Sequence, residues 1–185
     1  AGRRALQLDI ALEPFTRALE PRLGDADRGA AYLRLLVETY ERRAAPLAHA
    51  AAYGDDATRQ EASGRLDVLA RRSLQPLLDA LSGDDATLRR TALRVLVAQR
   101  NVAAAGAVSR LLDASDPELR LDAVVALVTL GVPGAVDAVE RAALSGGEPV
   151  ASLAALVLQR GRGPEAAAAC RRLALARDVA ADTRA

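Results

Sequence analysis

The stretch Ser115–Leu144 reads SDPELRLDAVVALVTLGVPGAVDAVERAAL and predicts two helices joined by a tight turn. Asp116 is a favourable cap for a helix, and the proline that follows it suits the first helical position. Apolar residues then recur every three or four positions as far as Leu130, which is the spacing of one helix face. Gly131 supplies the left-handed conformation that commonly ends a helix. A second helix is expected to follow, with these residues facing inward: Val136, Val139, Ala143 and Leu144.

The start of this hairpin has counterparts elsewhere in the chain. The string GDDAT occurs at Gly54–Thr58 and again at Gly83–Thr87, and a degenerate copy begins at Gly24. The next position in the series is held by Gly146–Pro149. A period of about thirty residues without strand signals is typical of stacked helical pairs. The expected repeats lie near 1–23 (partial), 24–53, 54–82, 83–114, 115–145, 146–176 and 177–185 (truncated).

These repeats predict an all-α fold, a right-handed α-solenoid of about five to six helical hairpins in which each hairpin buries its apolar face on its neighbours. We expect one repeat domain over residues 1–185. The chain begins at Ala1 rather than at methionine, so we expect it to be a fragment of a longer protein.

Three prolines recur at similar spacing, at Pro14, Pro46 and Pro76. Proline in a helix interior costs about 3 kcal/mol, whereas it is tolerated at a helix start. We therefore expect a helix to begin at or just before each proline. The repeat 54–82 carries Ser63–Gly64 in its first helix, and because glycine weakens a helix, this helix is expected to be irregular or to start late.

Composition narrows the classes of function. The 25 basic residues are all arginine, 24 residues are acidic, and the net charge is +1. This balance gives no bulk attraction to nucleic acid, so no nucleic-acid partner is expected. Arginine without lysine indicates a high-GC, bacterial coding sequence.

Few residues could carry metal or cofactor chemistry, because the chain has one histidine, His49, and one cysteine, Cys170. A metal site needs more ligands, and a catalytic histidine needs a nucleophile or carboxylate in reach. We expect no metal, no cofactor and no enzyme activity. No apolar run is long enough to span a membrane. The cytoplasm is the expected compartment, with a periplasmic or membrane-tethered placement left open.

Arginines gather where the first helices are expected to end. They form a predicted basic rim made of Arg42, Arg43, Arg71, Arg72, Arg100 and Arg160. Such a rim suits phosphate, acidic peptide or lipid headgroups. Cations also stabilise the C-terminal end of a helix through its dipole, and this structural role is the favoured interpretation.

The segment Ser115–Leu144 resembles bacterial HEAT-like repeats of the phycobilisome-lyase type. The residues that match the family pattern are Asp116, Pro117, Arg120, Ala123, Ala126, Leu127, Gly131, Ala135 and Val136. The resemblance extends well over 83–176 and loosely over 24–82. It implies that the second helices line the inner surface of the solenoid.

Polar residues on the otherwise Ala- and Val-rich second helices are the candidate contacts for a protein partner. They are Arg110, Asp113, Asp137, Arg141 and Arg171. The favoured function is a non-catalytic scaffold or adaptor that binds a protein along the groove. Two alternatives are left open: an appended soluble domain of a membrane-anchored or multidomain protein, and a lyase- or glycosylase-type protein that acts on a chromophore or on DNA.

Overall fold

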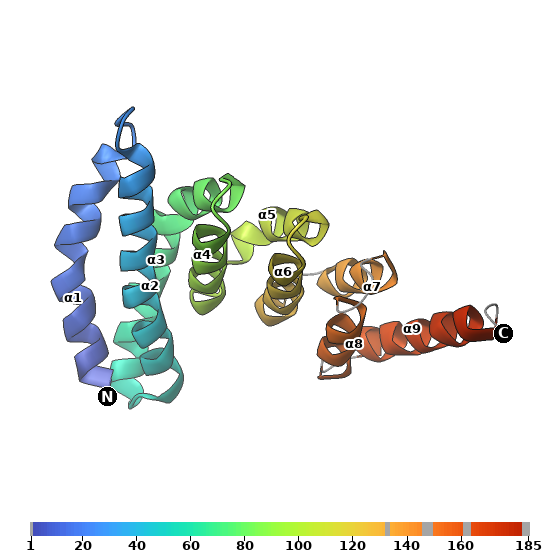
Figure 1. Cartoon of the computed structure of the whole chain (residues 1–185). Helices are drawn as coiled ribbons and strands as arrows, with labels where there is room; N and C mark the ends of the chain where they lie inside the picture. The colour runs from blue at the N-terminus through green and yellow to red at the C-terminus, as the bar shows by residue number, and fades with distance from the viewer. Residues whose placement is uncertain (1, 132–133, 146–149, 161–163, 183–185) are drawn as a thin grey trace. The chain divides into compact units, whose positions relative to one another are not determined.

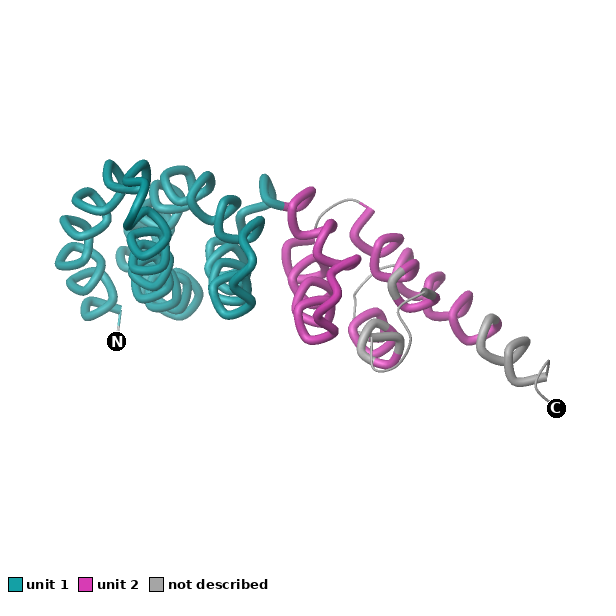
Figure 2. The backbone as a smooth tube through the Cα atoms, turned by 45° about the horizontal axis from the view of Figure 1, so that its top comes forward, with its two compact units in different colours: residues 1–104 teal, residues 105–185 magenta. Residues whose placement is uncertain are grey.

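The computed structural model describes residues 2–131, 134–145, 150–160 and 164–182 (Figure 1). Over these residues all secondary structure is helical, which confirms the predicted all-α fold. The chain divides into two compact units, residues 1–104 (unit 1) and 105–185 (unit 2), coloured separately in Figure 2. The boundary falls inside the predicted repeat 83–114, and the single domain over 1–185 stays a prediction.

Unit 1 is built around one central helix. Its elements are α1 (Gly2–Leu19), the 3₁₀ turn η1 (Glu20–Arg22), α2 (Gly29–Tyr53), α3 (Asp56–Ser82), α4 (Ala86–Ala98) and the 3₁₀ turn η2 (Val102–Ala104). Helix α2 packs against α1, α3 and α4. Its side chains Leu36, Tyr40 and Leu47 are completely buried, so α2 supplies much of the core of this unit.

The predicted helix starts at the three prolines are wrong. Pro14, Pro46 and Pro76 lie inside α1, α2 and α3, respectively. Each of the segments 24–53 and 54–82 is therefore mainly one long helix rather than a hairpin. The segment around Ser63–Gly64 is also regular α-helix, not the irregular start that was expected. Packing of α2 against three neighbours offsets a local preference of a few kcal/mol, which is how tertiary context overrides propensity.

The repeated GDDAT string has a defined role as a helix cap. The carboxylate of Asp55 accepts a hydrogen bond from the N–H of Thr58 at 2.8 Å, and that of Asp85 accepts one from Leu88 at 3.0 Å. The two copies start α3 and α4. The spacing between the two copies of the string therefore corresponds to the length of one helix, α3, rather than to a helical hairpin.

We expect the Asp85 cap to weaken in acid. The N–H of Leu88 and the guanidinium of Arg34 hold the pKa of Asp85 below its usual value. Because the pKa is lower in the folded than in the unfolded state, the carboxylate stabilises the fold above about pH 4, and this contribution is lost as the pH falls through the folded value.

The variant Asp85→Asn keeps a capping oxygen but cannot titrate. The stability advantage of the wild type over this variant should therefore shrink in thermal melts recorded from about pH 6 down to about pH 2. An advantage that stays constant over this range would contradict the assignment.

Unit 2 contains α-helices of 6 to 19 residues and one 3₁₀ turn. They are α5 (Ala105–Arg110), the 3₁₀ turn η3 (Leu111–Asp113), α6 (Pro117–Leu130), α7 (Ala135–Ser145), α8 (Val150–Arg160) and α9 (Pro164–Asp182). Helix α6 packs against α5, α7 and α8, and α7 packs against α9. The buried side chains of α6 include Leu119, Val124 and Leu127, so its apolar stripe forms the core as predicted.

The boundaries of α6 confirm the sequence prediction. Asp116 caps the helix by accepting a hydrogen bond from the N–H of Glu118, and Gly131 ends it in a left-handed conformation with φ of 63°.

Two other expectations for unit 2 are wrong. Leu144 is 59% exposed rather than buried. Helix α9 runs on to Asp182, so the described part of 177–185 continues α9 instead of starting a new repeat. The predicted repeat start at Gly146–Pro149 lies outside the described residues.

An arginine that follows the capping aspartate by four positions holds the loop before the helix. Arg120 donates to the carbonyl oxygen of Ala114 at 2.7 Å, and Arg89 donates to that of Gly83. In both cases the carbonyl lies two residues before the capping aspartate, Asp116 or Asp85. At these two junctions the aspartate caps the first turn of the helix, and the arginine hydrogen-bonds the loop that precedes it.

Candidate functional site: a charged groove between α1 and α3

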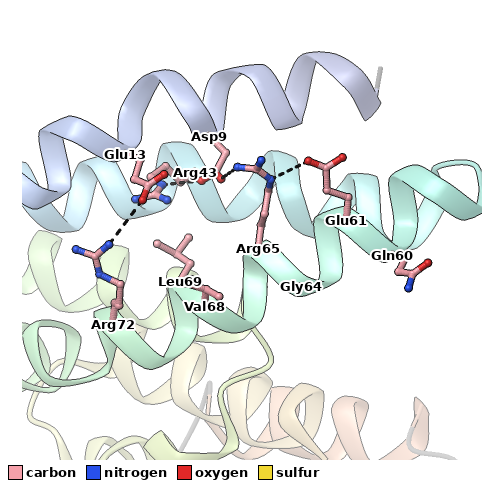
Figure 3. Close-up of a pocket in the computed structure, with 10 residues that line it drawn as sticks. All are labelled: Asp9, Glu13, Arg43, Gln60, Glu61, Gly64, Arg65, Val68, Leu69 and Arg72. Atoms are coloured by element: carbon pink, nitrogen blue, oxygen red, sulfur yellow. Dashed lines mark hydrogen bonds and ion pairs between the residues drawn. The ribbon is translucent and has the colours of Figure 1, made fainter.

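A groove of about 290 Å³ lies between α1 and α3, with α2 behind it (Figure 3). Most of its lining is charged or polar. The lining residues are Asp9, Glu13, Arg43, Gln60, Glu61, Gly64, Arg65, Val68, Leu69 and Arg72. The lining therefore brings three acidic side chains and three arginines together beside two apolar side chains, Val68 and Leu69.

The back of the groove holds a buried ion pair. Arg43 Nε donates to Asp9 Oδ1 at 2.7 Å, and another nitrogen of Arg43 donates to Thr16 Oγ1 at 2.8 Å. Asp9 is 2% exposed and Arg43 is 6% exposed. Charges removed from water persist only when they are paired and hydrogen-bonded, and this cluster meets that condition while it joins α1 to α2.

Arg65 extends the cluster from α3. Figure 3 shows its guanidinium directed toward both Asp9 and Glu61. It donates to Asp9 Oδ2 at 3.2 Å and to Glu61 Oε1 at 3.1 Å. Burial opposes the charged form, but these two carboxylates outweigh it and raise the pKa of Arg65. Asp9 is thus shared by arginines from two helices.

Arg72 makes a second link between α3 and the N-terminal elements. It donates to Glu20 Oε2 at 2.7 Å, and this bond raises the pKa of Arg72. Arg72 Nη1 also lies 3.9 Å from Glu13 Oε1. The other oxygen of Glu20 accepts from the buried hydroxyl of Tyr40 at 3.0 Å. This network connects α3, η1 and α2.

The continuity of α3 puts its groove residues on one face. Glu61, Arg65, Val68 and Arg72 follow at helical spacing, and Val68 is 49% exposed. A Cβ added at Gly64 would meet nothing within 4 Å, so the groove is open there. The site offers carboxylates, guanidinium donors and a small apolar contact.

The residues of the predicted basic rim do not all lie at helix ends, as had been expected. Arg42 and Arg43 lie in the middle of α2, and Arg71 and Arg72 lie in the middle of α3, not at turns. Only one of the rim residues whose side chains are described sits at a turn: Arg100, in a left-handed conformation with φ of 50°. Arg160 is the last residue of α8, and its side chain lies outside the described part. The error follows from the misplaced helix starts.

The five predicted contact residues all lie in unit 2 and are exposed. Asp137 and Arg141 are on α7, which packs against α9, the helix that carries Arg171. Arg110 and Asp113 belong to α5 and η3, which pack against α6. The structure therefore places three of the five on neighbouring helices.

Sequence reasoning missed a pair that joins α7 to α9. Arg172 donates two hydrogen bonds to Glu140, from Nε to Oε1 at 2.6 Å and from Nη2 to Oε2 at 2.5 Å. Glu140 is nearly buried, and Arg172 lowers its pKa. Unit 1 has the same arrangement, with carboxylates on the earlier helix, α1, and arginines on the later one, α3. The polar character of Glu140 on a buried helix face was the available signal.

Comparison with known families agrees with the architecture. Residues 74–159, from the last turns of α3 into α8, match the family model of HEAT repeats. No curated protein matches the chain. Among the described helices, none combines the length and apolar character needed to cross a bilayer. The match supports the interpretation of the chain as a HEAT-like repeat protein.

Proposed function

We propose that the protein is a non-catalytic scaffold that binds a protein partner along a groove between its helices. Helical-repeat proteins stack their units into extended binding surfaces, and the HEAT match assigns part of this chain to such an architecture. In unit 1 the proposed surface is the groove between α1 and α3. In unit 2 the candidate contact residues lie on α5, η3, α7 and α9.

The α1–α3 groove is the observation that carries the proposal. Arg65 and Arg72 keep 29% and 33% of their side-chain surface exposed although both are paired. A guanidinium has five donors in a planar fork, so each arginine can bind a partner's carboxylate while it holds its own. Exposed Val68 adds apolar contact beside them. Charged groups of this kind give an interface its register and specificity.

Filling the groove at Gly64 tests the proposal. Gly64→Trp should abolish capture of the partner from a cell extract, because the indole would occupy space that is open in the wild type. Gly64→Ala is the matched control. It should preserve capture and raise the free energy of unfolding by about 1 kcal/mol, because alanine is the better helix former. Undiminished capture by a folded Gly64→Trp variant would refute the groove as the binding site.

The predicted contacts in unit 2 extend the same proposal. Reversing the charges of Arg110 and Arg141 to glutamate should abolish partner capture and leave the melting temperature nearly unchanged, since both side chains are exposed. Pull-down and thermal melting of the double variant provide the two readouts. If capture persists, unit 2 is not part of the binding surface.

Two finer points belong to the proposal. We infer repeats of the bacterial phycobilisome-lyase type from the Asp116, Pro117 and Arg120 pattern, and we propose the cytoplasm as the compartment. Fractionation of the source cells, with detection of the protein in the cytosolic or the membrane fraction, tests the second point.

A further inference from the structure

The turn that follows α4 carries an arginine where the equivalent turn of unit 2 carries a glycine. Arg100 has φ of 50° and Gly131 has φ of 63°. The offset along the sequence between these two residues equals that between the capping residues Asp85 and Asp116. The N–H groups of Arg100 and Gly131 each donate to the carbonyl oxygen three residues earlier, at 3.0 and 3.1 Å. Both residues therefore occupy the same position, the left-handed residue that ends a helix.

Arginine is the costlier residue at this position. A left-handed conformation brings the Cβ of an L-residue close to the following carbonyl oxygen, and glycine has no such contact. The positive charge of Arg100 at the end of α4 offsets part of this cost. The interaction of an exposed cation with the helix dipole is smaller, however, than the steric penalty. The stability of the turn alone therefore favours glycine at position 100.

Neighbours on both sides hold Arg100 in the left-handed conformation. The side-chain amide of Asn101 donates to the carbonyl oxygen of Ala70 on α3 at 3.0 Å. On the other side, Gln99 is buried and its Nε2 donates to the buried Ser73 Oγ at 2.9 Å. A strained residue persists when the surrounding contacts determine its conformation in this way. The backbone of Arg100 is thus fixed relative to α3.

The side chain of Arg100 is exposed, and within the described part of the chain it makes no hydrogen bond or ion pair. The charged residues of α3 closest in sequence to Ala70 are Asp67 and Arg71, which are both exposed and of opposite sign. Val102, two positions after Arg100, is 58% exposed. The turn thus presents an unpaired guanidinium beside an apolar side chain.

We propose that Arg100 is a contact residue that binds a carboxylate of the partner protein, with Val102 as the apolar contact beside it. A guanidinium has only donors, so its ligand must present acceptors, and a carboxylate matches its planar fork. A phosphate group also matches the fork, but it would use the arginine alone. A carboxylate on a protein surface brings carbon atoms that also cover Val102.

This inference rests on the proposed scaffold function but not on the α1–α3 groove. No residue of the turn is among those that line the groove. Ala70 is two positions from both Val68 and Arg72, and residues two apart do not share a helix face. The turn therefore packs on another side of α3, and the two contacts can be tested separately.

Opposite effects on stability and on binding are the signature that we expect. Arg100→Gly should raise the melting temperature of unit 1, followed by tyrosine fluorescence, by roughly 2–6 °C, because it relieves the strain. The larger entropy of glycine in the unfolded chain reduces this gain without cancelling it. Arg100→Ala is the matched control. It removes the guanidinium but keeps a Cβ, so its melting temperature should stay within about 1 °C of the wild type.

Nuclear magnetic resonance on the full chain measures the binding. The probe is a short peptide of leucines and glutamates, and a second peptide has glutamine in place of glutamate. The Nε–Hε signal of Arg100, identified by its absence in Arg100→Lys, should shift saturably with the glutamate peptide and little with the glutamine peptide. Arg42, exposed in the middle of α2, should shift less. Arg100→Gly and Arg100→Ala should each weaken the glutamate peptide about fivefold or more.

Gly64→Trp should leave this titration unchanged, so a failure of the groove is distinguished from a failure at Arg100. Three results overturn the proposal. The first is a melting temperature that does not rise in Arg100→Gly. The second is an equal shift of Arg100 with both peptides, or equal shifts of Arg100 and Arg42. The third is a larger shift with inorganic phosphate, at the same ionic strength, than with the glutamate peptide, because the ligand would then be a phosphate group.

Discussion

Replacing Asp9 by alanine is expected to lower the free energy of unfolding of unit 1 by about 3–5 kcal/mol, because it leaves the charge of Arg43 buried without its carboxylate. The two side chains are 2% and 6% exposed, and they are joined at 2.7 Å. Asp9 also accepts from Arg65, so its loss removes contacts to both α2 and α3. We expect α1 to be the element that loosens.

Urea denaturation followed by tyrosine fluorescence measures this effect. All three tyrosines lie in unit 1, so the signal reports on that unit alone. The double variant Asp9→Leu/Arg43→Met should recover most of the loss, since apolar side chains of similar volume can replace a buried pair. Asp56→Ala, which removes the partner of Arg59 on the surface, is the control and should have little effect. An Asp9→Ala variant as stable as this control would show that the pair is not buried.

The second large effect is expected at Tyr40. Its side chain is completely buried in α2, and burial, with the nearby Glu20 carboxylate, raises its pKa far above the ordinary value. The phenol thus stays protonated and donates to Glu20. Tyr40→Ala should cost about 3–5 kcal/mol, the usual range for an aromatic side chain removed from a core.

The variant Tyr40→Phe separates the hydroxyl from the ring. It keeps the packing and removes one hydrogen bond, so it should cost about 1 kcal/mol. Glu20 remains bonded to Arg72, which limits the loss. Denaturation of both variants, followed by the two remaining tyrosines, gives the comparison. Equal costs for the two variants would mean that the hydroxyl, not the ring, carries the stability.

Local signals were enough to predict α6. Asp116, Pro117 and Gly131 each act on their own few residues, and all three mark the helix ends where the structure has them. The prolines show where local signals fail. Pro46 and Pro76 favour a helix start, but each lies in a helix held on more than one side by neighbouring helices. Such packing has no counterpart in the local sequence.

The groove depends on partners far apart in the chain. Asp9 meets Arg43 and Arg65, and no spacing rule connects these positions. One signal was nevertheless present. Asp9 and Thr16 occupy one face of α1, and Arg65 and Arg72 occupy one face of α3, at positions where a packed helix normally carries apolar residues. Polar residues at core-facing positions on neighbouring helices indicate a network of this type.

Site-directed photo-cross-linking tests most directly whether the α1–α3 groove binds the partner. A benzophenone amino acid is placed at Val68, which lines the groove, and in a matched protein at Ser63, which is exposed on the same helix outside the lining. We predict that the captured partner cross-links from position 68 and not from position 63. Cross-linking from position 63 alone, or equally from both positions, would contradict the assignment of the groove.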